Sequence, residues 1–237
     1  LPGNGCPSAK ETEKVRMRVS KGKLYGVLTG DIVGFSKLPV GQRRKINDIL
    51  KEGCREINRV FKGSVPLDVD VFRGDSWQLL VADAALALRA ALYLRAHLRG
   101  SNEALKLDTR IAIGVGTVDF LPGDRVSKGD GPAYRISGSG LESMNKAGRM
   151  CFGFKGSDVE GAIDVIVRLT DVLAMNWSGR QARALTGALQ GLTQEKIGAL
   201  WTPPITQQSV NRHLQRAGWF AIEEAVAYFE KQLSKAV

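Results

Sequence analysis

Two hydrophobic patterns alternate along the first two thirds of the chain. Short runs of apolar and β-branched residues predict strands, whereas longer stretches with apolar residues three or four positions apart predict helices. The expected strands are 24–29, 67–73, 76–81, 110–120 and 150–154, and the expected helices are 40–61, 84–98 and 136–147. Gly74-Asp75 is typical of a tight hairpin, because glycine permits a positive φ. A hairpin set among helical connections indicates an α+β fold, with helices packed on a mixed sheet.

The pattern becomes wholly helical in the last third of the chain. Apolar residues at helical spacing predict an amphipathic connector over 157–178, with Ile163, Val167, Leu169, Val172 and Leu173. Further helices are expected at 180–189, 194–201, 207–216 and 221–233. Thr193 and Thr206 stand at N-cap positions, and Pro203-Pro204 enforces a turn because proline cannot continue a helix. The expected division is a basic flexible tail (1–23), an α+β domain (24–156), the connector (157–178) and an all-α domain (179–237).

The predicted helix 207–216 has one apolar side and one polar side. Val210 and Leu214 share a face, against which Ile197, Leu200 and Ile205 are expected to pack. The polar side combines Gln, Asn and Arg, the residue types that read base edges in the major groove. Basic residues beside them can contact phosphates. The predicted DNA-binding residues are Thr206, Gln207, Gln208, Asn211, Arg212, Gln215, Arg216 and Lys196.

The stretch GLTQEKIGALW…ITQQSVNRHLQRAGW, residues 191–219, resembles the helix-turn-helix of sigma-factor region 4 and related regulators. One departure is that Trp-Thr-Pro-Pro replaces the usual Leu-Gly before Ile205. The resemblance implies double-stranded DNA as a partner and a homodimer, since such regulators usually bind two half-sites. The alternative is a helical bundle used for dimerisation, in which Ile222, Val226 and Phe229 of the last helix form the dimer face.

Composition and charge narrow the choice of partners. The chain has 237 residues, of which 43% are hydrophobic and 24% are charged, as in ordinary globular proteins. A net charge of +10 favours an anionic partner, most often nucleic acid. The 3 cysteines lie far apart, which argues against a disulfide framework or a zinc site. No apolar run approaches the roughly 18–20 residues of a membrane helix, so we expect a cytoplasmic protein without a membrane partner.

Two aspartates stand in turn-forming contexts at the ends of strand-like runs. Asp31 lies in GDIVGFS and Asp75 in FRGD. Carboxylates at neighbouring strand ends can hold divalent cations on the phosphates of a nucleotide, because Mg²⁺ prefers hard oxygen ligands. The turn at Gly34 can present backbone N–H groups to an anion. The alternative is that each aspartate only shapes or caps a turn.

The element order and both aspartate motifs resemble the catalytic domain of class III nucleotidyl cyclases, a relative of the polymerase palm. In that family the first metal aspartate lies in D-[IV]-x-G-F-[ST], the second lies in a G-D hairpin, and R-[IV]-G-I-H-x-G-x-V resembles the stretch 110–118 here. The resemblance covers about residues 24–154 and implies a ferredoxin-like, palm-type sheet. The whole layout, with a helix-turn-helix behind it, is similar to the SatD-like proteins.

The cyclase resemblance implies a set of ligand-binding residues. Mg²⁺ or Mn²⁺ would be held by Asp31, Asp75 and the backbone carbonyl of Ile32, and a nucleotide would lie near Gly34, Phe35, Ser36 and Arg73. The lysine with which the family reads the base is replaced by Val71. The nearest occupants of the transition-state asparagine and arginine positions are Arg135 and Ser139.

Three functions are consistent with these patterns. The first is a DNA-binding transcriptional regulator, whose palm-like domain binds a nucleotide through a divalent metal and is coupled to the DNA-binding helices by the connector. The second is a two-metal nucleotidyl cyclase or nucleotidyltransferase, whose helix-turn-helix targets it to DNA or dimerises it. The third is an interaction protein in which the palm-like fold is only a scaffold.

Overall fold

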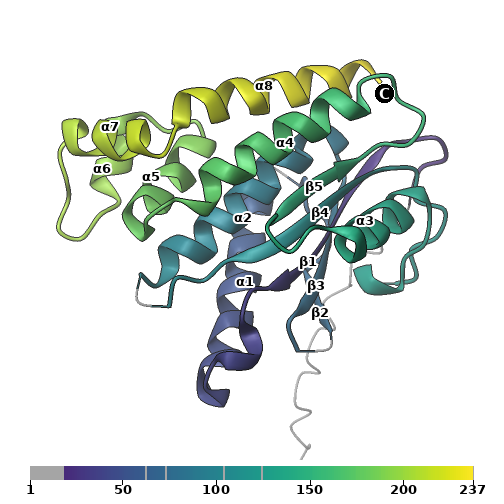
Figure 1. The fold of residues 1–237 in the computed structure, drawn as a ribbon, viewed down its shortest axis with the longest axis horizontal. Helices are drawn as coiled ribbons and strands as arrows, with labels where there is room; N and C mark the ends of the chain where they lie inside the picture. The colour runs from purple at the N-terminus through teal and green to yellow at the C-terminus, as the bar shows by residue number, and fades with distance from the viewer. Residues whose placement is uncertain (1–18, 62, 73, 104, 124, 237) are drawn as a thin grey trace, which may run out of the picture.

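A computed structural model describes residues 19–61, 63–72, 74–103, 105–123 and 125–236. Most of the expected basic tail and the predicted phosphate-binding residue Arg73 lie outside these ranges. The centre of the molecule is a five-stranded sheet with the order β2-β3-β1-β4-β5 (Figure 1). Its strands are β1 (Tyr25–Ile32), β2 (Asp70–Phe72), β3 (Ser76–Val81), β4 (Thr109–Gly116) and β5 (Met150–Gly153). All neighbours are antiparallel except β4 and β5, which are parallel, so the expected mixed sheet is confirmed.

The helices cover both faces of this sheet. Helices α1 (Val40–Val60) and α2 (Ala87–Ser101) lie on one face, and α3 (Pro132–Ser143) lies on the other (Figure 1). Successive residues of β1 serve different layers, because side chains alternate along a strand. Val27 joins the buried cluster under α3, whereas Leu28 joins the larger cluster under α1 and α2.

Two glycines in β4 allow α3 to approach the sheet closely. A Cβ atom at Gly114 would lie 2.3 Å from the backbone oxygen of Ala133, and one at Gly116 would lie 3.0 Å from the nitrogen of the same residue. The two glycines therefore permit a close backbone approach between β4 and α3. Any larger side chain at Gly114 would push α3 away from the sheet.

The C-terminal third is helical, as expected, and consists of α4 (Glu160–Met175), α5 (Gly179–Leu189), α6 (Gln194–Ala199), α7 (Gln207–Arg216) and α8 (Trp219–Lys235). The predicted caps are confirmed, since the side chains of Thr193 and Thr206 accept hydrogen bonds from the backbone nitrogens of Lys196 and Ser209. Ser178 and Gln181 form a capping box at the start of α5.

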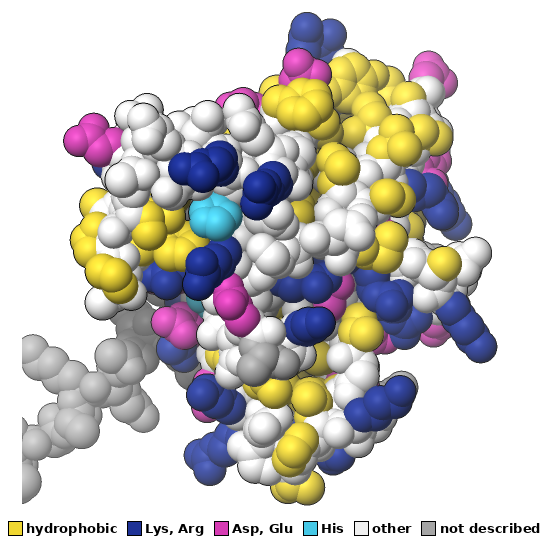
Figure 2. Space-filling model, turned by 60° about the vertical axis from the view of Figure 1, so that its left-hand side comes forward, with side chains coloured by type: hydrophobic (Ala, Val, Ile, Leu, Met, Phe, Trp, Pro, Cys, Tyr) yellow, Lys and Arg dark blue, Asp and Glu magenta, His cyan; other side chains and the backbone are white. Residues whose placement is uncertain are grey.

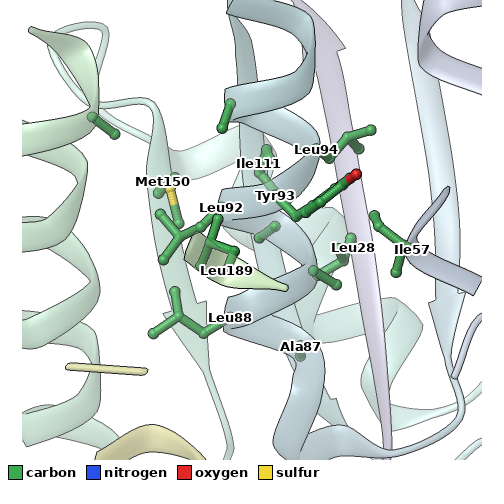
Figure 3. Close-up of a cluster of buried hydrophobic side chains, with 14 of the residues drawn as sticks. Leu28, Ile57, Ala87, Leu88, Leu92, Tyr93, Leu94, Ile111, Met150 and Leu189 are labelled. Atoms are coloured by element: carbon green, nitrogen blue, oxygen red, sulfur yellow. The ribbon is translucent and has the colours of Figure 1, made fainter. Parts of the chain in front are cut away.

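The helical region shares one buried cluster with the sheet. Figure 3 shows Leu88 and Leu92 of α2 beside Leu189 of α5, with Leu28 and Ile111 of the sheet in the same cluster. On the polar side of this junction Arg89 of α2 donates to the carboxylate of Glu230 in α8, at 2.6 Å for the shorter contact, and to the carbonyl of Leu189. Apolar and ionic contacts together therefore attach the C-terminal helices to α2.

A buried ionic cluster joins α2, the start of β4 and α4. The guanidinium of Arg95 is fully buried and donates to Asp108 at 2.7 Å and to Asp171 at 2.5 Å. Burial by itself lowers the pKa of Arg95, but the hydrogen bonds and charges of the two carboxylates outweigh it and raise that pKa above its ordinary value. Asp171 also accepts the backbone N–H groups of Arg149 and Met150, which fixes α4 against β5.

Several expected side-chain positions are wrong. Ile222, Val226 and Phe229 were the proposed dimer face of the last helix, but all three are buried in the core of the chain itself. Leu200 was expected to pack under α7, yet it is 58% exposed because α6 ends before it and the chain turns outward.

Two strand boundaries also differ from the prediction. The expected strand 67–73 is only Asp70–Phe72, and Asp31 lies within β1 rather than after it.

Among the residues that the structure describes, no helix is long and apolar enough to span a membrane.

Candidate functional site

The first candidate site is a cavity at the end of β1, which we call the β1 cavity. It has a volume of about 310 Å³ and is lined by Asp31, Ile32, Val33, Gly34, Phe35, Ser36, Asp75, Arg110, Lys146 and Arg149. Gly34 adopts a left-handed conformation with φ 70°, and this turn leads the chain into a short 3-10 helix, Phe35–Lys37. The structure thus brings together the residues expected to bind metal and phosphate, apart from Arg73, which lies outside the described ranges.

The strand register positions both aspartates at this cavity. Asp31 pairs with Ser76 of β3 on one side and with Arg110 of β4 on the other. The backbone N–H of Ile32 donates to the carbonyl oxygen of Asp75 at 3.1 Å, which holds the hairpin turn beside the end of β1. Residues that are 44 positions apart in sequence, Asp31 and Asp75, therefore line one small volume.

Arg110 neutralises Asp31 with a bidentate contact. Its Nε atom donates to Oδ1 of Asp31 at 2.8 Å, and its Nη2 atom donates to Oδ2. The hydrogen bonds that Arg110 donates to Asp31, aided by the charges of Asp31 and Asp75, keep the pKa of Arg110 above its ordinary value. A ligand cation that reaches Asp31 therefore has to displace a guanidinium.

The donor set of the β1 cavity fits a metal only when a ligand completes it. In the described part of the chain, no group of three or more His, Cys, Asp or Glu side chains is placed to hold a metal ion. Mg²⁺ commonly uses one or two carboxylates together with phosphate oxygens and water. Asp31, Asp75 and the carbonyl of Ile32 could hold such an ion on a phosphate, and Arg110 would then be free to contact that phosphate.

Sequence reasoning missed three cationic residues of the cavity. Arg110 could have been found from the antiparallel pairing of the first and fourth strands, which places it opposite Asp31. Lys146 and Arg149 come from the connection between α3 and β5, and no local pattern indicated that this connection reaches the end of β1. With two carboxylates and three cationic side chains, the cavity has a formal excess of positive charge.

Arg135 and Ser139, the expected occupants of the transition-state positions, lie elsewhere. Arg135 is exposed on α3 and contacts Asp119 and Asp130 at 3.2 and 2.8 Å. The hydroxyl of Ser139 donates to the carbonyl of Arg135 within the same helix. Neither residue lines the β1 cavity.

The second candidate site is the pair of helices α6 and α7 with the turn between them. Ile197, Val210 and Leu214 are buried between the helices and the rest of the core. A Cβ atom at Gly198 would lie only 2.3 Å from the carbonyl oxygen of Ile205, and the N–H of Ile205 donates to the carbonyl of Gly198 at 3.2 Å. Glycine is thus required where the turn returns across α6.

Aromatic stacking stabilises the Trp201–Ile205 turn. The rings of Trp201 and His213 lie 5.6 Å apart and nearly parallel, and the guanidinium of Arg183 lies 4.6 Å from the centre of the Trp201 ring. Arg183 also donates to the carbonyl of Leu200 at 2.8 Å. Partial burial, together with the charges of Arg180, Arg216 and Arg212, lowers the pKa of His213 and so favours the neutral form of its ring.

Most of the predicted DNA-binding side chains point into solvent. Asn211 is half-buried and accepts a hydrogen bond from Gln194 of α6 at 3.4 Å, so it contributes to the joint between the two helices. Figure 2 turns this end of the molecule forward and shows Lys and Arg side chains gathered around a histidine. The exposed members of the predicted set are Thr206, Gln207, Gln208, Arg212, Gln215, Arg216 and Lys196.

Comparisons with known proteins add a distant structural similarity. No protein-family model and no curated protein sequence matches the chain. Among solved structures, a bacterial light-regulated adenylyl cyclase is similar over 54% of this chain and 74% of that chain, with 22% identity and a TM-score of 0.39. The guanylyl cyclase Cya2 is similar over the same shares, 54% and 74%, with 16% identity and a TM-score of 0.39. About half of the chain thus has a distant similarity to cyclase domains, and the C-terminal helices follow it.

Proposed function

We propose that the protein is a DNA-binding transcriptional regulator, with α7 as the helix that enters the major groove. The observation that carries the proposal is the two-sided structure of α7. Val210 and Leu214 anchor its apolar side, while Gln207 and Gln208 stand exposed at its N-terminal end and Arg212 stands exposed near its middle. Recognition helices present their N-terminal residues to base edges, and Gln and Arg are the residue types that recognise adenine and guanine there.

The charge around α7 supports the same proposal. Lys196 on α6 and Arg216 at the end of α7 are exposed and can contact phosphates on either side of the groove. Phosphate contacts position a protein on the duplex, and base contacts determine the sequence that it selects. The two sets of side chains should therefore give different responses when they are mutated.

The first experiment selects bound sequences from a random double-stranded DNA library and then measures affinity by fluorescence anisotropy at several salt concentrations. Gln208→Ala and Arg212→Ala should each weaken binding to the selected site by about 1–3 kcal/mol and relax its sequence preference. Lys196→Ala should weaken binding to all sequences and reduce the salt slope by about 1. Lys51→Ala, which removes an exposed positive charge from α1, is the matched control and should bind like the wild type.

Two results would remove this proposal. One is a library that yields no enriched sequence. The other is an enriched sequence that Gln208→Ala and Arg212→Ala bind as tightly as the wild type does, which would place the DNA contact outside α7.

We propose a nucleotide, held with a divalent cation, as the ligand of the β1 cavity. The observation that favours it is the meeting of two carboxylates with Arg110, Lys146 and Arg149 in about 310 Å³. Carboxylates suit the cation, and the three cationic side chains suit the phosphates. Turnover of the bound nucleotide, as in a cyclase or nucleotidyltransferase, is the alternative to a purely sensory role.

Calorimetric titration with ATP and GTP, each with Mg²⁺ and with EDTA, tests the second proposal. Asp75→Asn should remove only the metal-dependent part of the affinity, whereas Lys146→Ala should weaken binding with or without metal. Asp48→Asn, at an exposed position of α1, is the control. Chromatography of the same mixtures separates the two roles, because a new product that Asp75→Asn fails to form would show an enzyme. Absence of heat with every nucleotide would refute the proposal.

A further inference from the structure

Helix α4 is apolar on two opposite sides. Ile163, Val167 and Ala174 are buried against β5 and the neighbouring helices. On the other side Val165, Leu169 and Val172 are 56%, 63% and 53% exposed. An apolar side of a helix is usually buried against another element. The second apolar side of α4 therefore lacks a partner within the described part of the chain.

Helix α8 extends this apolar surface. The described ranges contain eight exposed large hydrophobic side chains, and five of them lie on α4 and α8. Phe220 and Tyr228 are the two that belong to α8. A groove of about 440 Å³ runs between the two helices and is lined by Ile166, Leu169, Thr170, Leu173, Ala221, Glu224, Ala225 and Tyr228. Figure 2 shows hydrophobic side chains gathered at the upper right, on the side where α4 and α8 lie. Concentrated apolar surface of this kind marks an interaction site.

We propose that the α4–α8 surface is a homodimer interface, in which the α4 helices of two copies cross in antiparallel orientation with Leu169 near the two-fold axis. The spacing along α4 is self-complementary about that residue. An antiparallel pair centred on Leu169 places Val165 opposite Leu173 of the second copy and Ile166 opposite Val172. Every large apolar residue of the exposed side then meets another one.

The charges of α4 are compatible with this arrangement. In the same register Arg168 lies opposite Thr170 rather than opposite a second arginine. Arg168 already pairs with Asp164 of its own helix, at 2.7 Å, and therefore lies beside the contact without an unpaired charge. Antiparallel helices also place opposite ends of their dipoles together. A two-fold contact requires one surface to fit a copy of itself, and the α4–α8 surface meets that condition.

The interface would fix the spacing of the two α7 helices. The indole N–H of Trp177, just after α4, donates to the carbonyl of Ala217 at 3.1 Å, and a Cβ atom at Gly218 would contact Leu173. The end of α4 is thus attached to the corner between α7 and α8. A two-fold axis at Leu169 would relate both α7 helices, whether or not they bind DNA, so the dimer can be tested independently of the proposed function.

Sedimentation equilibrium of the full chain without DNA tests the proposal. The wild type should be a dimer at micromolar concentrations, and Leu169→Glu should raise the dimer dissociation constant at least about 30-fold, as expected of an interface hot spot. Because Leu169 is exposed, circular dichroism should show the variant folded. Val40→Glu changes an apolar residue on α1 that is even more exposed than Leu169, and it should leave the dimer intact.

Crosslinking tests the register. In a Cys6→Ser background, Leu169→Cys should form a disulfide-linked dimer on mild oxidation, whereas Val40→Cys should not, and the two remaining cysteines, Cys54 and Cys151, are buried. A wild type that stays monomeric up to about 100-fold higher concentration would overturn the proposal and leave this face to a different partner. A dimer that is unaffected by Leu169→Glu, or one in which the Leu169→Cys variant fails to crosslink, would also overturn it.

Discussion

Replacing Arg95 with methionine removes the centre of the ionic cluster between α2, β4 and α4. Arg95 makes three charge-assisted hydrogen bonds, to Asp108 at 2.7 and 3.1 Å and to Asp171 at 2.5 Å, and its side chain has 0% exposure. Methionine has a similar length but supplies no charge. Asp108 keeps a contact with Arg99 at 2.9 Å, while Asp171 keeps only backbone N–H donors.

The expected loss of stability in Arg95→Met arises from the carboxylate of Asp171, which loses its charged partner. Removing one partner of a buried pair leaves the other as an uncompensated charge, which costs about 3–5 kcal/mol. That loss is a large fraction of the roughly 5–15 kcal/mol that stabilises a domain. We therefore expect Arg95→Met to lower the free energy of unfolding by about 3–5 kcal/mol, measured by guanidinium denaturation with circular dichroism.

A matched control and a double variant make this prediction specific. Arg59 also pairs with a carboxylate, Glu56, but its side chain is 72% exposed, so Arg59→Met should lower the free energy of unfolding far less than Arg95→Met does. Adding Asp171→Asn to Arg95→Met should cost at least about 1 kcal/mol less than adding it to the wild type, because the uncompensated charge is then removed. If Arg95→Met and Arg59→Met have equal effects, burial of the cluster does not determine its contribution and the reasoning is refuted.

Three other predictions concern single positions. Gly198→Ala should lower the free energy of unfolding by about 1–3 kcal/mol, because the added Cβ would lie 2.3 Å from the carbonyl oxygen of Ile205. Gly138→Ala in α3, where an added Cβ meets no other atom, should not lower it, and equal denaturation curves for the two variants would refute this reasoning. Burial lowers the pKa of His97, so at a pH below the ordinary histidine pKa of about 6.5 the unfolded chain binds more protons than the folded chain does. The free energy of unfolding of the wild type should therefore fall between about pH 7 and about pH 5 by more than that of His97→Gln does. Parallel pH profiles of the two proteins would contradict the lowered pKa of His97. Trp201→Ala should leave the circular dichroism spectrum unchanged but weaken DNA binding, because the stacking of Trp201 with His213 and Arg183 that positions the turn before α7 is lost. An unchanged DNA affinity would show that the turn does not depend on this stacking.

The sequence by itself determined the local structure of this protein. The threonine caps of α6 and α7 are consequences of side chains acting on their own backbone within three residues. The Gly74-Asp75 hairpin has a similarly local cause. Strand and helix periodicities indicated the mixed sheet and the C-terminal helices, because alternation and 3.6-residue spacing are direct consequences of burying one side of an element. The two aspartates at the β1 cavity were also found in this way, since each belongs to a short motif.

Only the tertiary structure decided which side of each helix is covered. The apolar residues of α8 have the same spacing whether they face the core or a second copy, and the fold buries Ile222, Val226 and Phe229. In α4 the pattern had to be divided between a buried side and the exposed side around Leu169. Periodicity indicates that one side of a helix is apolar. Which part of the protein covers that side depends on contacts between residues far apart in the chain.

The positions of the cationic residues at the β1 cavity were also decided only by the tertiary structure. Arg110 meets Asp31 across 79 positions of sequence, and Lys146 and Arg149 reach the cavity from a connection without regular structure. Charges interact through space, so residue type alone could not show that a guanidinium neutralises one of the two aspartates. The short motifs indicated the carboxylates, and strand register and chain path determined which cations stand beside them.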